Sequence, residues 1–420
     1  MQIVDRRRRG PVALALAGGG PEGAVYEIGA LHALNDALDG FDPAQAPIYV
    51  GVSAGAFVAS CLANNISTAQ LCRSVVAREP GEQPFDPGLF LTPAFGEFVR
   101  RGLSVPGHVV GALRARLTEP DGEGGWISAL TSRLGQAVPV AFFDNRPVRD
   151  FLERTFAVRG RTNDFRRLQR KLFVVASDLD SGEAVVFGAS GREKVPVSQA
   201  VQASTALPGL YPPVEIGGRH YVDGVLLKTL HASVALDHGA GLVLCVNPIV
   251  PVDAAAKAGI GPLTDRGLPA VMSQTLRAFV RSRLHVGLAA YEHRYDAADV
   301  LLFEPGRDDY RMFFSNVFSF ANRRLVLEHA YRSTLHQLAS RQEEVKTVLR
   351  HHDITLRTDL LARPETWDLW GSVGLPEAEI SRSYAAPVRR LQFTLNRLRR
   401  TLDGDERGRE RHQKRDPLPA

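Results

Sequence analysis

A serine between glycines, Gly51-Val52-Ser53-Ala54-Gly55, fits the G-x-S-x-G pattern of a catalytic nucleophile. The apolar run 48–50 precedes it and a helical pattern over 56–62 follows, which predicts a tight strand-to-helix turn. Such a turn exposes the serine oxygen, and the following helix points its N-terminal N–H groups at any oxyanion formed there. We therefore predict that Ser53 is the nucleophile of an acyl-transfer reaction.

Two kinds of base could take the proton of Ser53. Asp223 follows the strand-like segment 219–222, which puts a carboxylate at the sheet edge where Ser53 would lie. A carboxyl group with the reference pKa of about 4 is a weak base, but burial among apolar residues would raise that pKa. His231 and His238 follow Asp223 in the chain, so a triad of Ser53, Asp223 and His231 is also open.

A second glycine cluster, Gly18-Gly19-Gly20-Pro21-Glu22-Gly23, follows the apolar run 12–17 and satisfies G-x-G-x-x-G. That fingerprint is typical of dinucleotide-binding turns, which also need an acidic residue near the end of the second strand. Ser53 and its glycines occupy that place instead. We therefore interpret the first cluster as backbone that approaches an acyl oxyanion closely, with Pro21 unable to donate because it has no N–H.

Several blocks of the chain resemble the patatin-like phospholipase family, in the family's order, between residue 12 and about residue 250. Gly18-Gly-Gly-Pro-Glu-Gly23 looks like the family's glycine-rich loop, and Gly51-Val-Ser-Ala-Gly55 looks like its nucleophile elbow. Ala176-Ser-Asp-Leu-Asp-Ser-Gly-Glu183 is similar to its hairpin block, and Ala203-Ser-Thr-Ala-Leu-Pro-Gly-Leu-Tyr-Pro-Pro-Val214 to its proline-containing block. Asp223-Gly224 falls where the family carries the aspartate of a Ser-Asp dyad.

The resemblance implies a three-layer α/β/α fold and an esterase dyad of Ser53 and Asp223 without histidine. It also implies an oxyanion hole built from backbone N–H groups, for which the candidates are Gly18, Gly19, Gly20, Gly23 and Ala54. One departure concerns Glu22, because the family loop usually carries Arg or Lys there. A carboxylate would oppose an anionic head group unless it points away or pairs with a base, which bears on phospholipid preference more than on ester hydrolysis. Val225, where the family favours Gly or Ala, is a smaller change.

Strands, glycine turns and helices alternate over the first sixty residues, which predicts a mainly parallel sheet covered on both faces. We expect an α/β chain that divides into a basic tail at 1–10, a catalytic domain at 11–250, a mostly helical region at 251–402 and a disordered tail at 403–420. Within the catalytic domain, the irregular and aromatic-rich segment at about 80–140 predicts either an insertion or lid, or a helical cover over the sheet.

The net charge, the cysteine count and the lengths of the apolar runs exclude several classes of protein. A net charge of +5 over 420 residues does not indicate nucleic-acid binding, and three cysteines without a C-x-x-C or His/Cys cluster argue against a disulfide framework or a metal site. Arginines 6–9 and the run 12–17 imitate a secretory signal, but the run is short and glycines follow it directly. No apolar run approaches the roughly 18 residues of a membrane span. We expect a cytoplasmic protein, at most peripheral to a membrane, without cofactor or metal.

These patterns favour a serine acyl hydrolase acting on a lipid or another hydrophobic acyl ester. The alternative is a protein that keeps the fold but serves as a membrane-binding or regulatory scaffold, which Glu22 and the basic ends motivate. The basic amphipathic pattern at 388–400 is typical either of a helix that contacts anionic lipid or an acidic partner, or of a solvated helix.

Overall fold

The computed structural model describes residues 10–76, 87–94, 141–254, 261–295, 297–309 and 320–375. A central eight-stranded sheet has the strand order β6-β7-β4-β3-β1-β8-β9, with β5 also paired to β4. The bounds of these strands are β1 (Val12–Leu16), β3 (Ile48–Val52), β4 (Lys171–Asp178), β5 (Ala184–Phe187), β6 (Val214–Ile216), β7 (Arg219–Asp223), β8 (Leu242–Val246) and β9 (Asp299–Phe303). Strands β4, β3, β1, β8 and β9 run parallel, so the predicted mainly parallel sheet is confirmed.

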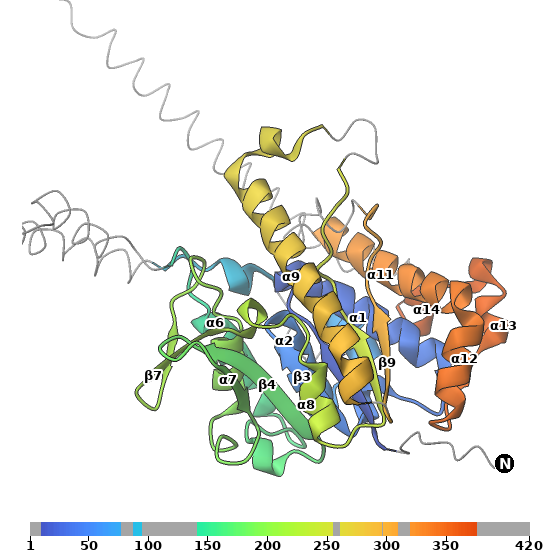
Figure 1. Cartoon of the computed structure of the whole chain (residues 1–420), viewed down its shortest axis with the longest axis horizontal. Helices are drawn as coiled ribbons and strands as arrows, with labels where there is room; N and C mark the ends of the chain where they lie inside the picture. The colour runs from blue at the N-terminus through green and yellow to red at the C-terminus, as the bar shows by residue number, and fades with distance from the viewer. Residues whose placement is uncertain are drawn as a thin grey trace, which may run out of the picture.

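Two apolar clusters cover the two faces of the sheet. Leu14 and Leu16 of β1 pack into one cluster, while Ala13 and Ala15 of the same strand pack into the other. The first cluster holds helices α1 (Gly20–Ala37), α2 (Ala54–Ala63), α3 (Thr68–Val76), α6 (Arg146–Phe156), α7 (Val197–Ser204) and α11 (Phe320–Ser340). The second holds α8 (Ala232–Asp237) and α9 (Gly267–Arg294), and Figure 1 shows α9 crossing in front of the strands. The chain is therefore a three-layer α/β/α structure, as expected.

Beyond residue 250 the described residues are mostly helical, as expected, but one strand of the central sheet also lies there. Strand β9 pairs in parallel with β8, so the sheet continues into a region that the pattern predicts as mostly helical. Helix α11 ends at Ser340 and α12 (Gln342–Arg350) follows it, with Arg341 between them. The remaining described elements are α13 (Thr358–Leu361), α14 (Leu369–Ser372) and a small antiparallel sheet of β2 (Leu38–Asp39) and β10 (Thr355–Leu356).

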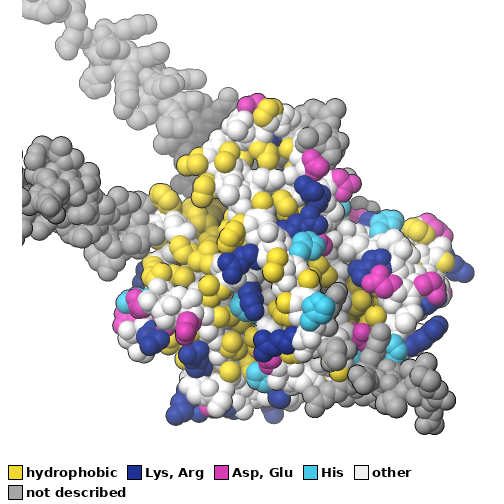
Figure 2. Space-filling view, in the orientation of Figure 1, with side chains coloured by type: hydrophobic (Ala, Val, Ile, Leu, Met, Phe, Trp, Pro, Cys, Tyr) yellow, Lys and Arg dark blue, Asp and Glu magenta, His cyan; other side chains and the backbone are white. Residues whose placement is uncertain are grey.

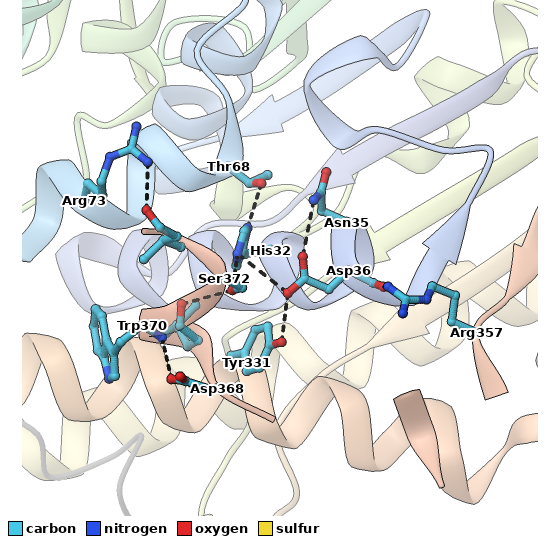
Figure 3. Close-up of polar contacts among 12 residues, drawn as sticks. His32, Asn35, Asp36, Thr68, Arg73, Tyr331, Arg357, Asp368, Trp370 and Ser372 are labelled. Atoms are coloured by element: carbon cyan, nitrogen blue, oxygen red, sulfur yellow. Dashed lines mark hydrogen bonds and ion pairs between the residues drawn. The ribbon is translucent and has the colours of Figure 1, made fainter. Parts of the chain in front are cut away.

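A buried polar network holds the C-terminal helices against α1 (Figure 3). The two ring nitrogens of His32 lie 2.9 Å from the hydroxyls of Thr68 and Ser372. The hydroxyl of Tyr331 donates to the carboxylate of Asp36 at 2.8 Å. Burial lowers the pKa of His32, which keeps the ring neutral and able to both donate and accept. The network therefore joins α1, α3, α11 and α14, and none of these side chains lines the cavity described below.

Two other predictions concern cysteine and membrane spans. Cys61, Cys72 and Cys245 are buried free thiols. Among the helices of the described residues, none has the length and apolarity needed to cross a bilayer. The basic tail 1–9, most of the predicted insertion at 80–140, the basic pattern at 388–400 and the tail 403–420 lie outside the described residues.

Candidate active site

Ser53 lies on a strained turn between β3 and α2. Its backbone has φ 54° and ψ −122°, a left-handed conformation that is unfavourable for a residue with a side chain. The backbone N–H of Ser53 donates to the hydroxyl of Ser204 at 2.8 Å, and that hydroxyl donates to the carbonyl of Val175 at 2.6 Å. Ser204 thus connects the turn to β4 and helps to hold the strained conformation.

The glycines on either side of Ser53 are required by close backbone contacts. A Cβ atom on Gly55 would lie 2.4 Å from the carbonyl oxygen of Leu16, and one on Gly51 would lie 2.5 Å from the Cα atom of Ala56. Both distances are far below a normal van der Waals contact, so neither position accepts a side chain without a shift of backbone. The spacing of small residues seen in the sequence is therefore what lets the turn close.

The register of the sheet brings Asp223 to the level of Ser53. Strand β4 lies between β3 and β7, with Val175 opposite Val52 and Ala176 opposite Asp223. Ser53 follows Val52 directly, so the two side chains meet across the end of β4. The side chain of Ser53 acts on the carboxylate of Asp223 and favours its charged form, and both residues line one cavity.

Burial raises the pKa of Asp223 and makes its carboxylate a stronger base. The residue is only 2% exposed, and loss of hydration raises the pKa of its carboxyl to about 7. The nearby side chain of Ser53 and a hydrogen bond from the backbone N–H of Val225 (2.9 Å) stabilise the carboxylate and limit the rise of its pKa. A pKa near neutrality lets the group both accept and return a proton.

Neither histidine of the alternative triad lies against the dyad. His231 is buried at the start of α8, and its pKa is lowered to about 4 by burial and by the charge of Lys228. The backbone of Gly224 and Lys228 partly offsets this fall in pKa, and the Nε2 atom of His231 has no hydrogen-bond partner among the described residues. His238 stacks on Phe173, with 4.2 Å between ring centroids. Within the described ranges, no hydrogen bond or ion pair joins either ring to Ser53 or Asp223.

The first glycine cluster follows β1 and begins α1 beside Ser53. A Cβ atom on Gly18 would lie 3.2 Å from the Cβ atom of Ser53, whereas Gly19 and Gly20 line the cavity. The first residues of a helix have N–H groups without an acceptor in the helix, and this holds for Gly20 in α1 and Ala54 in α2. The oxyanion hole expected at these residues stays a prediction.

Gly23 differs from the other glycines of this cluster. Its N–H donates to the carbonyl of Gly19 at 2.9 Å, in the first turn of α1, so in this conformation it is committed to the helix. The reason for glycine at positions 19 and 23 is packing, because a Cβ atom there would lie 2.6 Å and 3.0 Å from the ring of Pro248. Pro248 follows β8 and thus supports the loop from the neighbouring strand.

Ser53 and Asp223 open into a cavity of about 220 Å³ with mainly apolar walls. Besides the dyad, the described residues that line it are Gly19, Gly20, Pro21, Phe90, Thr205, Leu207, Leu210, Tyr211, Val225, Ile249, Ser273, Leu276 and Arg277. The sequence reasoning missed most of these walls. The proline-containing block could have indicated three of them, because Leu207, Leu210 and Tyr211 lie in it. No local sequence pattern indicates that Ile249 or the residues of α9 line the cavity.

Glu22 does not line this cavity, although it lies in the glycine loop. Burial raises the pKa of its carboxyl to about 8; the positive charge of Arg277 opposes this rise and Asp309 adds to it. Its Oε1 atom has no hydrogen-bond partner among the described residues. At neutral pH the side chain is therefore mainly protonated, and it places little negative charge beside the dyad.

Comparison with known proteins gives one family match and several weaker likenesses. The family model described as patatin-like phospholipase matches residues 14–236. Uncharacterized NTE family proteins of Mycobacterium bovis and Mycobacterium tuberculosis are 34% identical over 128 residues, which cover 27% of this chain and 21% of each relative. The match thus spans about a fifth of the length of these curated relatives.

Two solved structures are similar to this chain, both with low TM-scores. VipD from Legionella pneumophila has a TM-score of 0.33 and 12% identity, covering 90% of this chain and 86% of its own. The type III effector ExoU of Pseudomonas aeruginosa has a TM-score of 0.35 and 14% identity, covering 98% and 67%. At these scores the likeness adds no argument to the geometry described above.

Proposed function

Because the chain belongs to the patatin-like phospholipase family, whose members act on lipids, we propose that it hydrolyses acyl esters of lipids with Ser53 as nucleophile and Asp223 as base. One observation carries this proposal. A serine on a strained strand-to-helix turn and a buried carboxylate whose pKa is raised to about 7 line the same apolar cavity.

The proposed reaction has two halves. Asp223 takes the hydroxyl proton of Ser53 while the serine oxygen attacks the ester carbonyl, and the N–H groups of Gly19, Gly20 and Ala54 stabilise the oxyanion. When the C–O bond breaks, Asp223 gives the proton to the departing alcohol and the acyl group stays on Ser53. A water molecule then loses a proton to Asp223 and attacks the acyl-enzyme, which releases the fatty acid and restores the serine.

A fluorophosphonate probe tests whether Ser53 is activated. We expect the probe to form a covalent adduct that mass spectrometry of the digested protein places on the peptide containing Ser53. The heat-denatured protein is the control, since activation requires the folded turn. A folded protein that turns over no ester and takes up no probe would instead support the scaffold alternative.

Replacing His231 with glutamine separates the dyad from a histidine triad. We expect kcat to change by less than about threefold, because within the described ranges no hydrogen bond joins the imidazole to the dyad. Glutamine keeps polar atoms near this buried position and so limits the structural damage. Steady-state hydrolysis of a short-chain ester measures the effect. A fall of a thousandfold in a variant with unchanged circular dichroism would restore the triad.

The outer face of α9 exposes an unusual row of apolar side chains. Leu268, Met272, Phe279 and Val286 are 72%, 60%, 49% and 70% exposed. Their spacing of about three to four residues, or its multiples, keeps them on one side of the helix. The opposite side of α9 is buried against the sheet and the cavity. Figure 2 shows apolar side chains gathered on the upper part of this face of the molecule.

We infer that this outer face of α9 contacts the surface of a lipid bilayer. The helix flanks the cavity of the dyad, so the same contact would bring lipid esters to the opening. The exposed Arg283, whose guanidinium lies over the ring of Phe279, adds a positive charge that suits an anionic surface. An exposed apolar row of this extent is typical of an interaction site rather than of a solvated helix.

Vesicle sedimentation tests this contact. With vesicles of phosphatidylcholine and phosphatidylglycerol, we expect the variant Met272→Glu/Phe279→Glu to bind at least about tenfold more weakly, because each large side chain contributes roughly 1.5–3 kcal/mol when buried. Leu325→Glu, at a site of 53% exposure on α11, is the matched control and should bind normally. Equal binding by both variants would contradict the inference, and a monomer–dimer shift in the double variant would favour a protein partner instead.

A further inference from the structure

A second cavity, of about 380 Å³, lies between α9 and the segment that joins β7 to α8. It shares no described lining residue with the cavity of the dyad. Two cations line it, Lys228 from the joining segment and Arg283 from α9. Two hydroxyl groups, of Thr229 and Ser282, line it as well, and no acid does so among the described residues. The walls therefore favour an anionic ligand.

Both cations of this cavity are without an acidic partner in the described part of the chain. Arg281 and Arg294 of α9 each lie 3.5 Å from a carboxylate, but no ion pair of that kind involves Lys228 or Arg283. Arg283 instead places its guanidinium over the ring of Phe279, 5.4 Å from the centroid. Such a contact uses the flat face of the guanidinium, so the N–H groups around its edge remain able to bind an anion.

A glycine within α9 leaves room for that anion. Glycine in a helix interior is less stable than alanine, so its presence there calls for a reason. Packing gives none at Gly287, because beyond its chain neighbours and its own helix backbone no atom lies within 4 Å of the place of a Cβ. Gly287 lies four residues after Arg283 and four before Tyr291, on one side of the helix. A side chain at this position would fill the cavity beside the cation.

The wall of the cavity also holds a hydroxyl that lacks a partner. Thr229 is only 2% exposed, and its Oγ1 atom has no hydrogen-bond partner among the described residues. Buried polar atoms in proteins nearly always have one. A ligand with acceptor oxygens would supply the missing partner.

The cavity adjoins the apolar row on the outer face of α9. Val286, a member of that row, is 70% exposed and also lines the cavity. Phe279, another member, lies against the guanidinium of Arg283. Figure 2 shows basic side chains beside apolar ones on this face of the molecule. A ligand with an anionic group and an apolar chain would therefore find a place for each part.

We propose that this cavity binds the phosphate group of an anionic lipid, at a site separate from the one where Ser53 attacks the ester. The inference rests on the proposed contact of α9 with a bilayer and names the lipid group that this contact would hold. A guanidinium forms bidentate, charge-assisted hydrogen bonds with phosphate oxygens, and an ammonium group adds a point charge. Arg283 and Lys228 supply one of each, from two segments of the chain that both line the cavity.

Hexyl phosphate tests the site without catalysis and without a bilayer, because it has a phosphate and an alkyl chain but no acyl ester. In calorimetric titration we expect Lys228→Gln/Arg283→Gln to bind it about 10- to 100-fold more weakly than the wild type, since hydrogen-bonded charges are lost. Lys171→Gln/Lys194→Gln removes two exposed charges outside the cavity and should bind normally. Equal weakening in both double variants would assign the effect to net charge and overturn the proposal.

Filling the cavity gives a second readout in which every charge is kept. We expect Gly287→Phe to bind hexyl phosphate at least about tenfold more weakly, because the added ring would block access to the two cations. Ala289→Phe, at an exposed position of the same helix that does not line the cavity, is the matched control and should bind normally. Circular dichroism checks that both variants are folded. Unchanged affinity in a folded Gly287→Phe would contradict the proposal.

Inorganic phosphate distinguishes a lipid from a soluble phosphate ion as the occupant. We expect it to bind the wild type at least about tenfold more weakly than hexyl phosphate, because the alkyl chain is buried against the apolar row. Equal affinities would assign the cavity to a soluble phosphate ion and overturn the lipid assignment. In sedimentation with vesicles of phosphatidylcholine and phosphatidylglycerol, Lys228→Gln/Arg283→Gln should bind more weakly than Lys171→Gln/Lys194→Gln.

Failure of the proposed function can be told apart from failure of this inference. If the wild type neither hydrolyses esters nor sediments with vesicles, the titration with hexyl phosphate still measures the cavity. Loss of that binding in both Gly287→Phe and Lys228→Gln/Arg283→Gln would then still support the site. A wild type that sediments with vesicles but does not bind hexyl phosphate would overturn the site and leave the bilayer contact in place.

Discussion

Ser53→Ala is expected to lower ester hydrolysis by about 10⁴- to 10⁶-fold, to the background left by binding and the oxyanion donors. Alanine keeps the Cβ atom and the backbone conformation of the turn but has no oxygen to form the acyl-enzyme. Hydrolysis of a short-chain ester and of a phospholipid, followed by release of fatty acid, measures the loss.

The control for this change is Ser60→Ala, which removes another buried hydroxyl from the same helix α2. The Ser60 hydroxyl donates to the carbonyl of Phe57 at 2.7 Å and does not line the cavity. We expect Ser60→Ala to keep activity and to take up the fluorophosphonate probe, while Ser53→Ala does neither. Hydrolysis by a purified Ser53→Ala protein at the rate of the wild type would rule out the proposed mechanism.

Asp223→Asn is expected to lower kcat by about 10²- to 10⁴-fold, because an amide cannot accept the serine proton. The exposed Asp180→Asn, in the hairpin between β4 and β5, serves as the matched control. The wild-type rate should rise with pH as the carboxyl of Asp223 ionises around pH 7 and level off above it. Activity of Asp223→Asn close to that of the wild type, with the same pH profile, would assign the base to another group.

The same carboxyl makes stability depend on pH in a known direction. The pKa of Asp223 is raised from 3.8 to about 7 in the folded protein, so the folded state holds its proton more tightly than the unfolded state does. Stability is therefore lost as the pH rises from about 4 to about 7, by about 4 kcal/mol in all, at about 1.4 kcal/mol per pKa unit. Asp223→Asn should melt at a higher temperature than the wild type at pH 8, and lose this advantage near pH 4.

The parts of the site that could be predicted are those that local chemistry dictates. Gly51 and Gly55 are needed by the turn that exposes Ser53, so the pentapeptide carries its own structural reason. Asp223 could be placed because the ends of neighbouring strands meet at one edge of a sheet. Both inferences needed only the pattern of strands and turns near each residue.

The parts that escaped prediction depend on contacts between distant segments. Arg277 reaches the cavity because α9 packs on the face of the sheet opposite α1, and nothing in its helical neighbours indicates that packing. Strand β9 is a short apolar run whose identity comes from pairing with β8. Gly23 matches the glycine fingerprint, but its N–H is used inside α1 and its role is to make room for Pro248.

Helix α9 forms the inner wall of the cavity and also presents the apolar outer row, within one continuous helix of 28 residues. A displacement of the outer side of such a helix also moves its inner side, because both sides belong to one rigid element. Seating the helix on a lipid surface would thus set the position of the wall residues Ser273 and Leu276 relative to Ser53. Variants of α9 should accordingly differ more from the wild type when they are assayed on bilayers than on dispersed single substrate molecules.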